Sequence, residues 1–238
     1  ATSSVGPGST NMITAAAVAM RNRLPILFLP GDTFANRIPD PVLQQVEHFN
    51  NPNITQNDAF KYVTRYFDRI TRPEQILQTL PHAIQTMIDP ADCGPACISL
   101  SQDVQGETFD YPEEFFKEKI HTIRRPRPDD YQIKQAADLI KKSKNPIIIS
   151  GGGIFYSDAM KELSQFAKKH NIPTAQTVMG YSTMKKDDPY FLGAIGGFGG
   201  KAPNDFMKKT DLAIAIGTKL ADFTTGSWAN FENPNFKL

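Results

Sequence analysis

Cysteine is scarce in this chain of 238 residues, which contains only Cys93 and Cys97. Two cysteines, with no His-x-x-x-His pair nearby, are too few for a four-ligand zinc site. We therefore interpret Cys97 as a small apolar strand residue and Cys93 as a residue with no chemical role. The sequence predicts no metal site among its own residues.

Long apolar runs and an excess of charge are also missing. No segment approaches the roughly 18 to 20 uninterrupted apolar residues of a membrane span, and the first residues lack the basic and apolar regions of a secretory signal. The 26 basic and 25 acidic residues give a formal net charge of +1, so no broad field favours nucleic acid or an anionic membrane. These absences predict a cytoplasmic protein with a small-molecule or protein partner.

Familiar catalytic signatures are missing as well. The chain contains neither a G-x-S-x-G nucleophile elbow nor an H-E-x-x-H metal motif. The histidines stand in unrelated local settings, which is typical of surface or helix-end residues. They are His48, His82, His121 and His170. The residues alone therefore predict no catalytic group.

Short apolar runs rich in β-branched residues alternate with segments of helical periodicity. This order predicts an α/β fold in which parallel strands and crossover helices form two parallel-sheet, three-layer units. Pro25 and Pro30 are expected to bound a buried strand within residues 24–32. Pro81 is expected to kink the helix that begins near Pro73. The other expected strands are 96–104, 146–150 and 211–217.

A change in composition divides the chain into two parts. Residues 111–130 are dense in charge and proline and show neither the helical nor the strand period, which predicts an interdomain linker. The arginines of the Arg124–Arg127 run are followed at once by acidic residues, so we interpret them as solvated and predict no nucleic-acid partner. The first unit is expected to span residues 1–122 and the second residues 131–238.

A glycine turn stands near the start of the chain. The turn Gly6-Pro7-Gly8 precedes a helical run, and the three residues that follow it are competent N-caps. Such a turn either receives an anion or the polar edge of a ligand, or simply joins a strand to a helix. The candidate N-cap residues are Ser9, Thr10 and Asn11.

A second glycine run, Gly151–Gly153, is expected to join the strand 146–150 to a helix that Ser157 caps. The run resembles a dinucleotide-binding turn, but Tyr156 stands where the third glycine belongs. The acidic residue expected about 20 positions further on is also missing. The residues alone leave a structural turn and a stand-alone Rossmann-like nucleotide-binding module as alternatives.

Five motifs follow one another along the chain: TSSVGPGSTN (2–11), LPILFLPGD (24–32), GPACISLSQDV (94–104), PIIISGGG (146–153) and GTKLADFTTG (217–226). In this order and spacing the chain resembles thiamine-diphosphate enzymes of the acetohydroxyacid synthase and pyruvate oxidase type. The resemblance implies that residues 1–122 are the C-terminal part of a pyrimidine-binding domain. It also implies that residues 131–238 are a Rossmann-like central domain, truncated at its C-terminus.

The resemblance implies a cofactor site in the first unit. In these enzymes the G-P-G turn and the asparagine after it line the pocket for the aminopyrimidine ring of thiamine diphosphate. The matching residues are Gly6, Pro7, Gly8 and Asn11. Asn11 is expected to be the polar contact, and glycine to let the backbone approach the ring.

The resemblance also implies that other machinery lies outside this sequence. The glutamate that activates the cofactor is expected upstream of Ala1, and the GDG motif that holds the diphosphate through Mg²⁺ does not occur in the chain. The expectation is therefore a fragment that is inactive by itself and holds neither a catalytic residue nor a metal ligand. The full-length protein is expected to be a homodimer or homotetramer.

Departures from the family pattern concern FAD, which the synthases bind through their central domain. Lys219 and Phe223 stand where the synthases carry arginines, and Arg65-Tyr66 stands where they carry Lys-Trp. We therefore expect no FAD binding. The corresponding nucleotide groove, lined by Gly151–Gly153 and Gly196–Gly200, is expected to be vestigial or empty.

Three longer segments narrow the resemblance: PGDTFANRIPDPVLQQVEH, QDVQGETFDYPEEFF and IRRPRPDD. They are similar to the hydrolases that open a cyclic trihydroxycyclohexane-dione to a deoxy-glucuronic acid in myo-inositol catabolism. An acetolactate synthase or a 2-oxo acid decarboxylase of the same superfamily is the alternative, because the substrate pocket decides between them.

Overall fold

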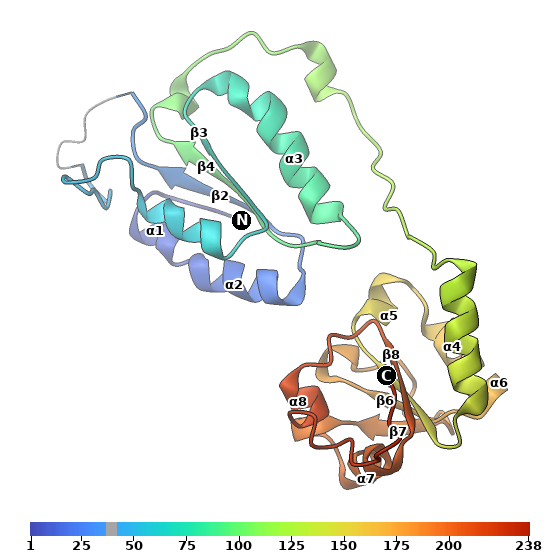
Figure 1. The fold of residues 1–238 in the computed structure, drawn as a ribbon. Coiled ribbons are helices and arrows are strands. Elements are labelled where there is room, and N and C mark those ends of the chain that lie inside the picture. The colour runs from blue at the N-terminus through green and yellow to red at the C-terminus, as the bar shows by residue number, and fades with distance from the viewer. Residues whose placement is uncertain (37–41) are drawn as a thin grey trace. The chain divides into compact units, whose positions relative to one another are not determined.

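The computed structural model describes residues 1–36 and 42–238, which divide into two compact units (Figure 1). The first unit is Ala1–Pro126 and the second is Arg127–Leu238. Each unit contains one four-stranded parallel sheet. The predicted α/β class with two parallel sheets is therefore confirmed, and the chain divides at residue 126, inside the segment predicted as a linker.

The first unit is built from β1 (Thr2–Ser3), β2 (Leu27–Asp32), β3 (Tyr66–Ile70) and β4 (Ala96–Ser101), in the sheet order β1-β2-β4-β3. Its helices are α1 (Pro7–Thr10), α2 (Ile13–Asn22) and α3 (Ile76–Ile88), with 3₁₀ turns at Gln56–Tyr62, Pro73–Gln75, Val104–Gly106 and Glu113–Phe116. Ile98 and Cys97 are neighbours in β4, so their side chains point to opposite faces of the sheet. Ile98 packs with Ala83 of α3, whereas Cys97 packs with Ala16 of α2, and these contacts define three layers (Figure 1).

The second unit is built from β5 (Pro146–Ser150), β6 (Thr174–Gln176), β7 (Phe191–Ala194) and β8 (Leu212–Ile216), in the order β7-β6-β5-β8. Its helices are α4 (Asp130–Lys142), α5 (Gly153–Tyr156), α6 (Met160–His170), α7 (Lys201–Lys209) and α8 (Asp222–Thr225), with 3₁₀ turns at Val178–Gly180 and Gly196–Phe198. The central strand β5 is buried on both faces, as its unbroken isoleucine run predicts. Ile149 packs with Met207 of α7, and Ile148 packs with Leu163 of α6.

The cysteines and histidines lie where the sequence predicts. Cys97 is fully buried in β4, and this burial raises the pKa of its thiol to about 12. Cys93 is half-buried, and its thiol donates to the carbonyl oxygen of Met87 at 3.0 Å. Each of the four histidines is exposed. These groups are therefore packing and surface residues.

The first turn is capped differently from the expectation. Helix α1 begins at Pro7 with Gly6 as its N-cap residue, and no side chain caps it. Ser9 and Thr10 lie inside the helix, where their hydroxyls donate to the carbonyl oxygens of Gly6 and Pro7. Asn11 follows the helix at its C-terminal end. The predicted N-caps are wrong because the fixed φ of Pro7 already suits the first helical position.

The helix after the second glycine run also starts earlier than expected. Helix α5 begins at Gly153, whose N–H donates to the carbonyl oxygen of Gly217 at 2.9 Å. Ser157 lies at the C-terminal end of α5, so the prediction that it caps the next helix is wrong. Asp158, at φ +51°, turns the chain between α5 and α6.

Two prolines lie within regular elements. Pro30 was expected to bound its strand but lies inside β2, opposite Ser3 of the two-residue edge strand β1. The register of β2 with β4 is interrupted at Leu29 and Pro30, because proline has no N–H to donate to the ladder. Helix α3 continues through Pro81, which is exposed, and the expected kink stays a prediction.

Gly6 occupies a position that no other residue fits. Its φ of +74° lies in the left-handed region, where a side chain is strained. A Cβ atom on Gly6 would also lie 1.6 Å from the carbonyl oxygen of Gln44. The turn after β1 and the segment around Gln44 therefore pack together through the bare backbone of Gly6.

Replacing Gly6 with alanine should destabilise the first unit by at least about 1 kcal/mol, because the backbone strain adds to the contact with Gln44. Gly106→Ala is the matched control, since a Cβ atom there has no neighbour within 4 Å. Urea denaturation followed by far-ultraviolet circular dichroism measures both variants. Equal stability of the two variants would contradict the structural role of Gly6.

Candidate functional site

Three segments with polar groups meet at the carboxyl edge of the first sheet. The turn Gly6–Gly8 follows β1, Asp32 ends β2, and Gln102 follows β4. The main-chain N–H of Gln102 donates to the carbonyl oxygen of Asp32 at 3.2 Å. A Cβ atom on Gly31 would lie 3.0 Å from the nitrogen of Val5, so the first two segments are also in contact. Ligands of open α/β sheets bind at this edge, which is therefore the candidate site.

The predicted cofactor residues lie together at this edge, within and beside α1. Gly6 is buried, Gly8 is half-buried, and Pro7 and Asn11 are exposed. The side-chain amide of Asn11 forms no hydrogen bond with any described residue, so its donors and acceptor are available to a ligand. The space beside Gly6 is filled by the carbonyl group of Gln44. The glycine at this position therefore serves the packing of the chain itself.

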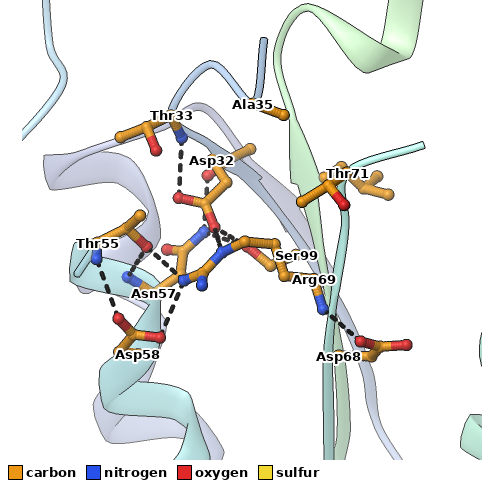
Figure 2. Close-up of polar contacts among 12 residues, drawn as sticks. Asp32, Thr33, Ala35, Thr55, Asn57, Asp58, Asp68, Arg69, Thr71 and Ser99 are labelled. Atoms are coloured by element: carbon orange, nitrogen blue, oxygen red, sulfur yellow. Dashed lines mark hydrogen bonds and ion pairs between the residues drawn. The ribbon is translucent and has the colours of Figure 1, made fainter. Parts of the chain in front are cut away.

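A buried ion pair lies directly beneath the edge. Figure 2 shows Arg69 of β3 reaching Asp32 at the end of β2 and Asp58 in the 3₁₀ turn. Its Nε donates to Oδ2 of Asp32 at 2.7 Å, and its Nη2 donates to Oδ1 of Asp58 at 2.9 Å. Asp32 is fully buried, so its negative charge is stabilised by the guanidinium of Arg69. Arg69 thus joins β2, β3 and the 3₁₀ turn.

Neutral side chains complete the network around Asp32. The hydroxyl of Ser99 in β4 donates to Oδ2 of Asp32 at 2.5 Å, and the amide of Asn57 donates to Ser99 Oγ at 2.7 Å. The same amide donates to the carbonyl oxygen of Gly31 at 2.9 Å. The N–H of Thr33 donates to the other carboxylate oxygen of Asp32 at 2.8 Å. Every part of the carboxylate of Asp32 is therefore engaged.

The electrostatics of this network are those of a structural ion pair. Burial lowers the pKa of Arg69, but Asp32 and Asp58 outweigh burial and raise it. Burial raises the pKa of Asp58, but hydrogen bonds from Lys61, the Thr55 N–H and Arg69 hold it below its ordinary value. Both shifts favour the charged forms of Arg69 and Asp58, as expected for a structural ion pair. Sequence reasoning missed the network, although a charged Arg69 within a strand is a signal for a buried partner.

Asp103 fastens two loops of the edge to each other. Its carboxylate accepts the N–H groups of Ala35 at 2.9 Å, Asn36 at 2.8 Å and Val104 at 3.1 Å. Burial raises the pKa of Asp103, but these backbone donors outweigh burial and lower it. The loop after β2 is therefore held against the loop after β4, which carries Gln102.

The glycines of the second unit pack against other loops of that unit. A Cβ atom on Gly153 would lie 2.6 Å from the Cα of Gly217, and one on Gly196 would lie 1.9 Å from the carbonyl oxygen of Phe223. The ring of Phe223 also stacks on Phe198, with 5.4 Å between centroids. These glycines allow the loops to approach one another. The vestigial nucleotide groove and the lack of FAD binding stay predictions.

Within the described part of the chain, no three His, Cys, Asp or Glu side chains come together to hold a metal ion. None of the helices in residues 1–36 and 42–238 has the length and apolar character needed to cross a lipid bilayer.

Comparison with known families identifies the second unit. Residues 133–238 match the central domain of thiamine pyrophosphate enzymes, which use the cofactor also called thiamine diphosphate. This stretch includes every strand of the second sheet. The resemblance to thiamine-diphosphate enzymes that the motifs indicated is therefore confirmed.

Individual relatives match both units. The chain is 50% identical over 236 residues to the 3D-(3,5/4)-trihydroxycyclohexane-1,2-dione hydrolase of Clostridium botulinum, covering 99% of this chain and 37% of the relative. It is 51% identical to the protein of that name in Clostridium perfringens and 48% identical to that in Bacillus cereus, covering 98% of this chain and 36% of each relative. The narrower resemblance to these hydrolases is thus confirmed, and the chain spans little more than a third of their length.

The ion pair between Arg69 and Asp32 is expected to stabilise the fold of the first unit. Arg69→Met should destabilise the first unit by about 3–5 kcal/mol, because the charge of Asp32 stays buried without a countercharge. The double variant with Asp32→Asn should recover part of this loss, since no buried charge is then left unpaired. Urea denaturation followed by circular dichroism measures both.

The control is Lys61→Met, which removes the exposed partner of Asp58 together with the contact of Lys61 over the Phe67 ring and should cost less than about 1 kcal/mol. Trp228, the single tryptophan, reports unfolding of the second unit by its fluorescence. A loss in Arg69→Met no larger than in the control would show that the pair does not stabilise the fold.

Proposed function

We propose that this chain supplies the pyrimidine-binding and central parts of a thiamine-diphosphate-dependent hydrolase that opens trihydroxycyclohexane-dione to a deoxy-glucuronic acid. The observation that carries the proposal is the identity of about 50% across both units with hydrolases named for that substrate. In this proposal residues 1–122 are the C-terminal part of the pyrimidine-binding domain, and residues 131–238 are the central domain.

The residues of the carboxyl edge suit one end of the cofactor. The aminopyrimidine ring presents hydrogen-bond donors and acceptors along one edge, and the exposed amide of Asn11, which has no partner among the described residues, can serve either kind. We place the ring against Gly6, Pro7, Gly8 and Asn11. When bound, thiamine diphosphate supplies the electron sink for cleavage of a carbon–carbon bond.

The role of this chain is binding and orientation. The Asp32–Arg69 pair and the Asp103 loop contacts fix the edge that carries Asn11 and Gln102. Fixed partners reduce the freedom that a bound ring would otherwise have to remove. The resemblance assigns the activating glutamate, the diphosphate and Mg²⁺ to other segments, and we propose a cytoplasmic homodimer or homotetramer.

In the full-length protein, Asn11→Ala should weaken thiamine diphosphate binding by up to about tenfold, since one neutral hydrogen bond is lost. Asn22→Ala is the matched control because Asn22 lies at the far end of α2, where its amide donates to the carbonyl oxygen of Val18. Titration of each apoenzyme with the cofactor measures the change. Unaltered affinity in Asn11→Ala would remove Asn11 from the site.

Assays of the full-length protein and of residues 1–238 with the cyclic dione and with pyruvate distinguish the candidate reactions. The full-length protein should hydrolyse the cyclic dione and leave pyruvate unchanged, and residues 1–238 alone should turn over neither substrate with thiamine diphosphate and Mg²⁺ present. Turnover of pyruvate alone would move the assignment to an acetolactate synthase or 2-oxo acid decarboxylase. Cofactor-dependent turnover by residues 1–238 would show that they hold a complete active site.

A further inference from the structure

Two glutamine side chains face each other at the carboxyl edge of the first sheet. The Nε2 atom of Gln45 lies 3.5 Å from Oε1 of Gln102, which is the outer limit of a hydrogen bond. Gln45 is only 8% exposed, whereas Gln102 beside it is exposed. The pair therefore lies at the surface of the edge, with one amide beneath the other.

One polar atom of the buried amide lacks a partner among the described residues. Oε1 of Gln45 accepts no hydrogen bond from any described residue, although it is shielded from water. Turning both amides by 180° would only exchange which polar atom of Gln45 is left unpaired. A buried polar atom without a partner is unfavourable, so such an atom at a binding edge is a candidate to bind a ligand.

Gln45 lies close to the turn Gly6–Gly8, because its neighbour in the chain, Gln44, contacts that turn. The carbonyl group of Gln44 packs against Gly6, at the start of the turn assigned to the pyrimidine ring. Gln102 is held from the other side, because its N–H donates to the carbonyl oxygen of Asp32 and the next residue is the loop-binding Asp103. The glutamine pair thus lies on the candidate site and is fixed by the same contacts.

The chemistry of the pair favours an uncharged, hydroxyl-rich ligand. An amide offers both donors and acceptors and carries no charge, so it suits hydroxyl and carbonyl groups of a ring. Arg69, beneath this edge, is already bound to Asp32 and Asp58, which leaves it unsuited to the carboxylate of a 2-oxo acid.

We propose that Gln45 and Gln102 bind the hydroxyl or carbonyl oxygens of the substrate ring and select a neutral cyclic polyol over an anionic 2-oxo acid. This inference rests on the proposed function, because it assigns the substrate to the site that holds the cofactor ring. Gln45 completes its hydrogen bonding only when the ligand is present. The pair thereby contributes to specificity without taking part in proton transfer.

The test uses the full-length protein with Gln45→Leu and Gln102→Leu. Gln45→Leu should raise the KM for the cyclic dione by about three- to tenfold, as expected for one neutral hydrogen bond. The kcat and the affinity for thiamine diphosphate should not change. Gln105→Leu is the control, since the amide of Gln105 is exposed and donates to a main-chain carbonyl of β4. An unchanged KM, or a loss of cofactor affinity instead, would overturn the proposal.

A second measurement separates this inference from the proposed function. Ligand-observed NMR with myo-inositol, a cyclic polyol that does not react, should show saturation transfer from the wild-type protein and a weaker signal from Gln45→Leu. This outcome supports the amide pair even if the wild-type protein does not hydrolyse the dione. Absence of transfer from the wild type would overturn it. If Gln45→Leu does not fold, the exposed Gln102→Leu carries both measurements.

Discussion

The carboxylate of Asp32 is fully buried at the end of β2, and its charge is stable there because Arg69 reaches it from β3. The arginine also binds Asp58 in the 3₁₀ turn, so one side chain ties together three segments far apart in sequence (Figure 2). Ser99 of β4 adds a fourth. The positions of the Gly6 turn and of Gln102 both depend on this arrangement, since each packs against the end of β2.

The layers of the fold could be predicted from the sequence because they depend on local patterns. An unbroken run such as Ile147–Ile149 fits a strand buried on both faces, and the spacing of apolar residues after Pro73 fits a helix with one apolar face. Both elements form as predicted. The order and spacing of the five motifs along the chain also indicate the family from the sequence alone.

The contacts of the site could not be predicted because they join residues distant in sequence. Gly6 requires its bare backbone because of Gln44, and Arg69 requires partners 37 and 11 residues away. Local rules also failed where a contact competed with them. Ser157 is a good N-cap residue, yet helix α5 begins before it, at Gly153, whose N–H donates a hydrogen bond to the carbonyl oxygen of Gly217. For Asn11, the motif indicated a contact, and the structure adds that its amide is exposed and unpaired among the described residues.

We propose that the carboxyl edge of the first sheet binds the pyrimidine end of thiamine diphosphate, and a crystal structure of the full-length protein with the cofactor and Mg²⁺ is the decisive experiment. We expect the aminopyrimidine ring to lie against the Gly6–Gly8 turn, within hydrogen-bond distance of the side-chain amide of Asn11. A ring bound elsewhere, with Asn11 facing solvent, would show that this edge is not the pyrimidine site.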